Sequence, residues 1–127
     1  MDAVDLATAT REYLDAVASH DSARVRATLH PDAEFHNGSG VFAGRDAYVA
    51  AFERVYPMVV RNEVRHIFVD GDLVCAVYDF VTPTSVGPVL SMELLTFDGG
   101  LIRSGELLFD LRQWPQVVAE VRAAAGA

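Results

Sequence analysis

The sequence predicts an α+β fold in which three helices precede a four-stranded antiparallel meander. Two observations carry this prediction. Apolar residues recur three and four positions apart between Leu6 and Tyr56, whereas turn-forming residues divide the segment from Asn62 to Asp110 into β-rich runs. Because the helices come first instead of alternating with strands, a doubly wound parallel sheet is excluded. We therefore expect one domain over residues 1–127, with the helices on one face of the sheet.

The first predicted helix covers residues 4–19. Its apolar residues form one stripe, which places Tyr13 on the inward face. Capping residues follow, and Val25 and Leu29 then mark a short second helix that ends before Pro31. The two helices are expected to pack on each other as an ordinary helical pair.

A short strand and a third helix come next. Residues 33–37 lack a helical stripe and lead into the flexible turn 38–40, so they predict a strand. The third helix is predicted over residues 44–56, with Phe52 among its inward residues and Pro57 at its end.

The meander follows from three turn signals, at residues 70–72, 83–88 and 98–100. They separate four strands that are joined as hairpins. Residues 113–124 are predicted to form a short amphipathic or extended tail that docks on the sheet.

The central hairpin decides where the carboxylates lie. If loop 83–88 is centred near Val86, antiparallel pairing places Asp79 opposite Glu93, and both share a face with Val77 and the equally apolar Cys75. Two carboxylates that face each other in apolar surroundings raise each other's pKa, so one can stay protonated near neutral pH. The alternative is a register shifted by one residue, which turns both side chains to solvent.

Charge and composition exclude several kinds of partner. The chain has 10 Lys and Arg against 18 Asp and Glu, a net charge of −8, and its basic residues are scattered singly. A nucleic acid backbone or an anionic membrane surface would therefore be repelled. No apolar run is long enough for a membrane span, so a cytoplasmic location is the expectation.

Nothing in the sequence points to a cofactor or a metal. Cys75 lies in an apolar run and is interpreted as core filler. The histidines lack the spacing of metal ligands, and Gly38-Ser39-Gly40 lacks the lysine of a phosphate-binding loop. His36 and Asn37 are neighbours on one strand, so only one points inward, and Asn37 is the expected one.

Two segments carry a resemblance to a known superfamily. Arg11–Val17 is similar to the first helix of ketosteroid isomerases, and Tyr13 occupies the position of their oxyanion-hole tyrosine. Met92–Phe97 is similar to the strand that bears a protonated aspartic acid in those enzymes, and Glu93 stands in its place. With the order of elements, these segments make nearly the whole chain resemble the SnoaL-like and ketosteroid isomerase-like superfamily.

This superfamily is also called the nuclear transport factor 2-like fold. The resemblance implies a cystatin-like cone, in which three N-terminal helices pack on a curved antiparallel sheet that encloses a pocket. It also implies a homodimer that pairs through the open face of the sheet.

Other positions depart from the family's catalytic sets. Asn37 matches a water-holding asparagine of limonene-type epoxide hydrolases, where Phe35 replaces their tyrosine, and it replaces the aspartate base of ketosteroid isomerases. Asp79 matches a further hydrolase carboxylate, but Val77 replaces the arginine that partners it. Leu107 stands where hydrolases and polyketide cyclases carry an aspartate.

We interpret Asp79 as the base that moves a proton, and Tyr13 with Glu93 as the pair that stabilises an enolate. Asn37 would orient substrate or water. The alternatives are a core tyrosine at position 13 and an exposed strand carboxylate at position 79. The pocket is expected to be lined by Phe35, Phe52, Val77, Leu95, Leu107 and Phe109.

Two classes of function stay open. The first is a cofactor-independent isomerase or cyclase that acts on a small hydrophobic carbonyl compound, such as a polyketide, steroid or terpenoid, with an epoxide hydrolase as a close variant. The second is a non-catalytic small-molecule binding or dimerisation domain, which Asn37 and Leu107 favour.

Overall fold

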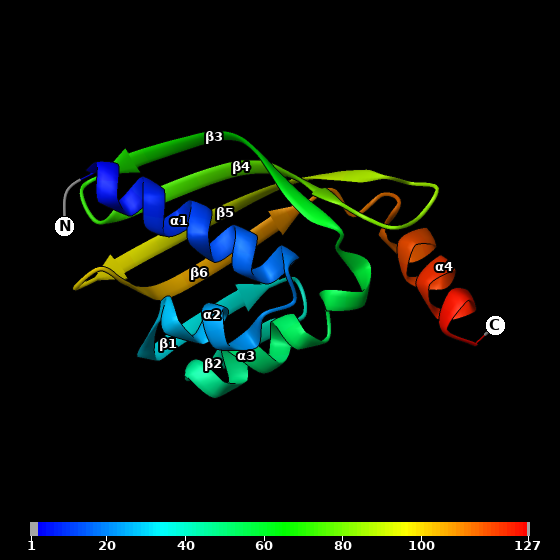
Figure 1. Cartoon of the computed structure of the whole chain (residues 1–127), viewed down its shortest axis with the longest axis horizontal. Helices are drawn as coiled ribbons and strands as arrows, with labels where there is room; N and C mark the ends of the chain where they lie inside the picture. Colours follow the sequence, from blue (N-terminus) through cyan, green and yellow to red (C-terminus); the bar gives the residue numbers. More distant parts are fainter. Residues whose placement is uncertain (1–2, 127) are drawn as a thin grey trace.

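A computed structural model describes residues 3–126 and shows an α+β fold with one curved six-stranded sheet. Its strand order is β2-β1-β6-β5-β4-β3, and β1 and β6 form the parallel pair. Figure 1 shows α1 lying across the sheet and α4 standing at one end of the molecule. In chain order the elements are α1 (Ala3–Ala18), α2 (Ser22–Ala27), β1 (Leu29–Asn37), β2 (Gly40–Ala43), α3 (Arg45–Glu53), a 3₁₀ turn (Tyr56–Met58), β3 (Arg61–Asp70), β4 (Leu73–Val81), β5 (Pro88–Asp98), β6 (Leu101–Phe109) and α4 (Trp114–Gly126).

The predicted helices and meander are confirmed, with three differences at their edges. Leu29 begins β1 instead of ending the second helix, and α3 stops at Glu53, ahead of a separate 3₁₀ turn. The strand before the flexible turn pairs with β2 and, in parallel, with β6, so the four-stranded meander is part of a six-stranded sheet. The C-terminal segment is a helix, and its Val117 is fully buried.

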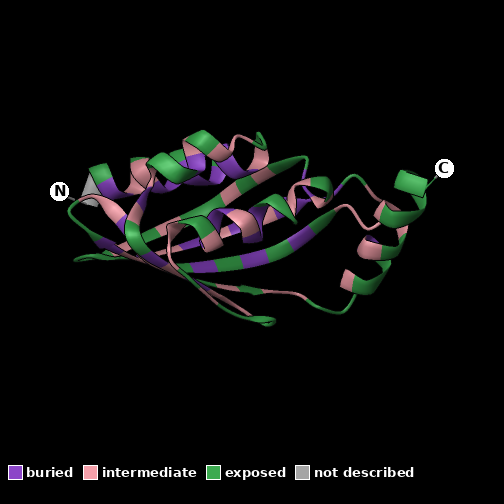
Figure 2. Cartoon of the chain, turned by 90° about the horizontal axis from the view of Figure 1, so that it is seen from below, coloured by how far each residue is buried: buried purple, intermediate pink, exposed green. Residues whose placement is uncertain are grey.

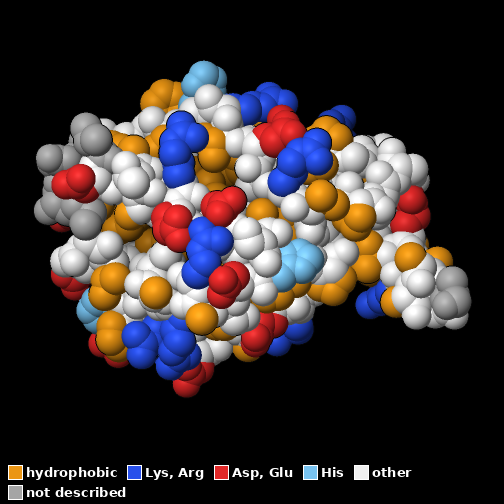
Figure 3. Space-filling model, in the orientation of Figure 1, with side chains coloured by type: hydrophobic (Ala, Val, Ile, Leu, Met, Phe, Trp, Pro, Cys, Tyr) orange, Lys and Arg blue, Asp and Glu red, His pale blue; other side chains and the backbone are white. Residues whose placement is uncertain are grey.

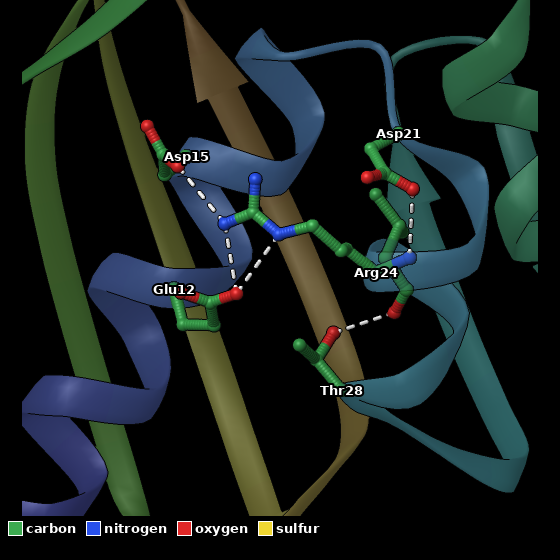
Figure 4. Close-up of polar contacts among 6 residues, drawn as sticks. Glu12, Asp15, Asp21, Arg24 and Thr28 are labelled. Atoms are coloured by element: carbon green, nitrogen blue, oxygen red, sulfur yellow. Dashed lines mark hydrogen bonds and ion pairs between the residues drawn. The ribbon is translucent and has the colours of Figure 1, made fainter.

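Ion pairs and a cap hold α2 against α1 (Figure 4). The Arg24 guanidinium donates to Glu12 at 2.8 Å and to Asp15 at 2.9 Å, both on α1. Asp21 caps α2 by accepting the Arg24 backbone N–H at 3.1 Å. Because these charged groups are exposed, the ion pairs contribute only modestly to stability.

The predicted pairing of β4 with β5 is wrong by three residues. Asp79 lies opposite Leu90, and Glu93 lies opposite Ala76. The loop is centred earlier than expected because Thr82 closes it, donating both its backbone N–H and its hydroxyl to the Gly87 carbonyl. A shift by an odd number of residues places Asp79 and Glu93 on opposite faces of the sheet.

The two faces of the sheet differ in what covers them. The helices pack on one face. Along β4 and β5, buried residues on that face alternate with more exposed residues on the opposite face (Figure 2). The outer face carries Cys75 and Val77 beside Asp79, so their expected inward position is also wrong. Exposed apolar residues of that face are Phe68, Leu73, Leu90, Met92, Leu94 and Leu108. No helix within residues 3–126 has the length and apolar character needed to cross a membrane.

Candidate functional site

A cavity of about 430 Å³ lies between the inner face of the sheet and the helices that cover it. Its walls are mostly apolar, with aromatic residues from β1, α3, β4 and β6. Trp114 at the start of α4 contacts Phe80 and Phe109 edge-on and closes one end. Figure 3 shows hydrophobic side chains gathered between α4 and the rest of the molecule. Over the remaining surface in this view, acidic and basic side chains are intermixed.

Glu93 is the one carboxylate among the described residues that line this cavity. It is 1% exposed, and both of its oxygens accept hydrogen bonds. Tyr13 donates to Oε2 at 2.6 Å, and Tyr78 donates to Oε1 at 2.8 Å. The hydroxyls of Tyr13 and Tyr48 lie 2.9 Å apart, so one carboxyl and three tyrosines form a connected buried network.

Burial raises the pKa of Glu93 from its ordinary 4.5 to about 7, and the hydrogen bonds from Tyr13 and Tyr78 oppose this rise. Burial, followed by the nearby Glu93 charge, raises the pKa of Tyr13 well above its usual value, so its hydroxyl stays protonated. The Glu93 carboxyl can therefore both take up and release a proton near neutral pH, which is the property of a general acid and base.

The network depends on a close approach of α3 to β6. Tyr48 points from α3 at Gly105, where an added Cβ would overlap the tyrosine hydroxyl oxygen. Gly105 pairs with Leu95 on one side and with Phe35 on the other, at the middle of the sheet. A residue without a side chain at this point lets Tyr48 reach Tyr13 and, through it, Glu93.

Two asparagines also line the cavity. Asn37 accepts the Ser39 backbone N–H at 2.7 Å, which holds the amide at the turn after β1. Asn62 donates to the Leu14 carbonyl at 3.0 Å, while its Oδ1 is buried and lacks a hydrogen-bond partner within the described residues. An unpaired buried acceptor costs about 1–3 kcal/mol, so Asn62 is suited to accept from a bound molecule.

The sequence pattern of the SnoaL-like domain family matches residues 10–105, which include Tyr13, Tyr48, Tyr78 and Glu93. The chain belongs to this family. A comparison of this chain with curated protein sequences finds no match.

Solved structures share the fold at low sequence identity. A candidate polyketide cyclase from Sinorhizobium meliloti has a TM-score of 0.73 at 21% identity, over 85% of this chain and 100% of its own. A nuclear transport factor 2-like protein of unknown function from Cytophaga hutchinsonii scores 0.71 at 20% identity, over 87% and 93% of the two chains. A de novo designed protein with a curved β-sheet scores 0.81 at 18% identity, over 98% and 99%. The fold alone therefore assigns no activity to the SnoaL-like domain.

The structure brings most of the expected site residues of this SnoaL-like domain together. Glu93 and Asn37 line the cavity, and Tyr13 bonds Glu93 from behind it without lining it. The expected inward position of Asn37 is confirmed, since His36 lies beside Glu34 at 3.4 Å on the other side of β1. Of the expected wall residues, those that line the cavity are Phe35, Phe52, Leu107 and Phe109.

Three expected residues lie elsewhere. Asp79 is on the outer face, where the Arg65 guanidinium donates to both of its oxygens at 3.0 Å. The position expected for a base inside the pocket is therefore wrong, for the reason of strand register given above. Val77 shares that outer face, and Leu95 is fully buried in the core without lining the cavity.

Four site residues were missed by sequence reasoning. Tyr48 belongs to the same inward stripe of the third predicted helix as Phe52, and only its contact with Tyr13 across the fold reveals its role. Tyr78 was missed because its strand was assigned the wrong face. Arg54 and Asn62, which also line the cavity, belong to no sequence pattern. Within residues 3–126, no three His, Cys, Asp or Glu side chains are grouped closely enough to hold a metal ion.

Proposed function

We propose that this SnoaL-like domain is a cofactor-independent enzyme of isomerase or cyclase type that moves a proton on a small hydrophobic carbonyl compound. One observation carries the proposal: a carboxyl whose pKa is about 7 lines an apolar cavity large enough for such a compound. Perturbed acids in apolar pockets are the default candidates for proton transfer.

In the proposed reaction, ionised Glu93 removes a proton from the carbon next to the substrate carbonyl. The C–H electron pair becomes the C=C bond of an enolate, whose charge resides on the former carbonyl oxygen. Each carboxylate oxygen has two lone pairs and gives only one to a tyrosine, so one lone pair of an oxygen is left for the substrate proton. Where the substrate carries a C=C bond between its β- and γ-carbons, the enolate is a dienolate, and return of the proton from Glu93 to the γ-carbon moves that double bond next to the carbonyl and completes an isomerisation.

Tyr78 would stabilise the enolate. Its hydroxyl is 2.8 Å from Glu93 Oε1, and Tyr78 lines the cavity. Once Glu93 holds the substrate proton, its oxygens attract the Tyr78 hydroxyl less strongly, and that hydroxyl can turn to the enolate oxygen. Tyr13 and Tyr48 would act as positioning residues that keep the Glu93 carboxyl in place.

The second candidate is a small-molecule binding domain without catalysis. It is favoured by the tyrosine hydroxyls that already occupy both Glu93 oxygens, and by Asn37 and Leu107 in place of family carboxylates. An epoxide hydrolase is less well supported, because Asp79, which matches a hydrolase carboxylate, lies on the outer face and is paired with Arg65.

Exchange of the α-hydrogens of 2-tetralone with D₂O, followed by proton NMR, distinguishes enzyme from binder. We expect the domain to accelerate exchange and Glu93→Gln to lower the rate about 100-fold or more. Asp79→Asn is the matched control on the outer face and should leave the rate unchanged. Binding of 2-tetralone without accelerated exchange would favour the binding domain, and equal loss in both variants would contradict the assignment of Glu93.

A further inference from the structure

The cavity has a second charged lining residue, Arg54, which the proposed proton transfer does not use. It follows directly after α3 and is exposed to solvent, so it marks the open side of the cavity. Its guanidinium lies over the ring of Phe42, 5.4 Å from the ring centre, and Phe42 also lines the cavity. This contact orients the cation at the opening.

Arg54 has no carboxylate partner within 4.0 Å among the described residues. Ion pairs of this length join five arginines that do not line the cavity to Asp or Glu: these are Arg24, Arg26, Arg61, Arg65 and Arg112. The adjacent Glu53 carboxylate instead accepts a hydrogen bond from Ser22. An arginine without a carboxylate partner at a cavity opening is available to an anion from outside.

We infer that the cavity takes an amphipathic carboxylic acid, with the apolar body of the molecule inside and its carboxylate on Arg54. This rests on the proposed function and specifies its substrate class: a hydrophobic carbonyl compound that also carries an acid group at the end remote from the reacting carbon. The two charged lining residues impose one orientation, because a carboxylate is attracted to Arg54 and repelled by Glu93. The reacting carbonyl then points to Glu93 and Tyr78.

Calorimetric titration with 1-naphthylacetate and its neutral analogue 1-naphthylacetamide tests this inference. The two probes share one aromatic body and differ in charge. We expect the acid to bind the unaltered chain about fivefold to tenfold more tightly than the amide. Arg54→Gln should abolish this preference for the acid over the amide, and Arg54→Lys should retain part of it.

Arg11→Gln is the matched control, since it removes the same charge from an exposed position of α1 that does not line the cavity. Equal affinity for acid and amide, failure of the acid to bind, or a preference that survives Arg54→Gln would each overturn the inference. Because these titrations involve no turnover, they give their result whether or not Glu93 proves to be catalytic.

Discussion

Glu93 is both a buried carboxyl and the residue to which we assign proton transfer. An isolated carboxylate in an apolar interior is costly, and the chain reduces that cost with two tyrosine hydroxyls and not with a cation. The result is a carboxyl whose folded-state pKa, about 7, lies above its ordinary 4.5. The same shift that suits proton transfer makes the stability of the protein depend on pH.

The direction of that dependence follows from proton binding. Between pH 4.5 and about 7 the folded state holds a proton on Glu93 that the unfolded state has lost. The contribution to stability is therefore complete below pH 4.5 and is lost as the pH rises through 7, a change of roughly 3 kcal/mol. Glu93→Gln should remove this loss, as measured by urea unfolding at several pH values.

Glu106→Gln is the control for that series, because Glu106 is an exposed glutamate on β6. The free energy of unfolding of the Glu106→Gln variant should show the same pH dependence as that of the unaltered chain. If the Glu93→Gln curve did so as well, the raised pKa of Glu93 would be contradicted.

At the scale of elements, the contact of α3 with β6 sets the geometry of the network. Gly105→Ala would push the Tyr48 hydroxyl away and separate it from Tyr13. We expect a loss of about 1–3 kcal/mol in the free energy of unfolding, measured with urea. Combining it with Tyr48→Phe, which removes the overlapping oxygen, should make the added cost of the alanine smaller.

Gly126→Ala provides the comparison for that substitution, since the Cβ it would add meets no atom within 4 Å beyond its chain neighbours and the adjacent backbone of α4. If Gly105→Ala lowered the free energy of unfolding by no more than Gly126→Ala does, the close approach of α3 to β6 would not depend on the absence of a side chain at position 105.

The sequence predicted the helices and strands better than it predicted which side of the sheet each strand residue faces. The helical stripe placed Tyr13 correctly because periodicity extends over many residues of α1. Which face Asp79 occupies depended on the centre of one loop, and the hydrogen bonds of Thr82 that fix this centre leave no periodic signal. Glu93 was expected inward and is buried, although the strand pairing used to place it was wrong. The contact between Tyr48 and Gly105 joins distant segments, so no local pattern could reveal it.

At the scale of the whole molecule, the outer face of the sheet carries exposed apolar side chains on several strands. Its central strands expose Leu90, Met92 and Leu94, each at 44–46%, with Phe68 and Leu108 at 60% and 63%. Contiguous apolar surface of this kind is typical of a protein interface. A second copy of the chain is the partner we propose, since two such faces can pack symmetrically.

Sedimentation equilibrium should therefore give the mass of two chains, and Leu94→Lys should shift the protein to a single chain, because a buried lysine would lack a partner. Val60→Lys serves as control, since Val60 is 49% exposed but precedes β3. A single-chain mass for the unaltered protein at high concentration would refute the proposed dimer.

The parallel pair of β1 with β6 also governs when the cavity comes into existence. Phe35 on β1 and Leu107 on β6 belong to adjacent strands, yet most of the chain separates them. Contacts between such distant segments close large loops and slow folding. During synthesis the cavity cannot form until β6 has been made, because β6 supplies the lining residues Leu107 and Phe109. A ligand that binds this cavity is thus expected to recognise only finished chains and to stabilise them against unfolding.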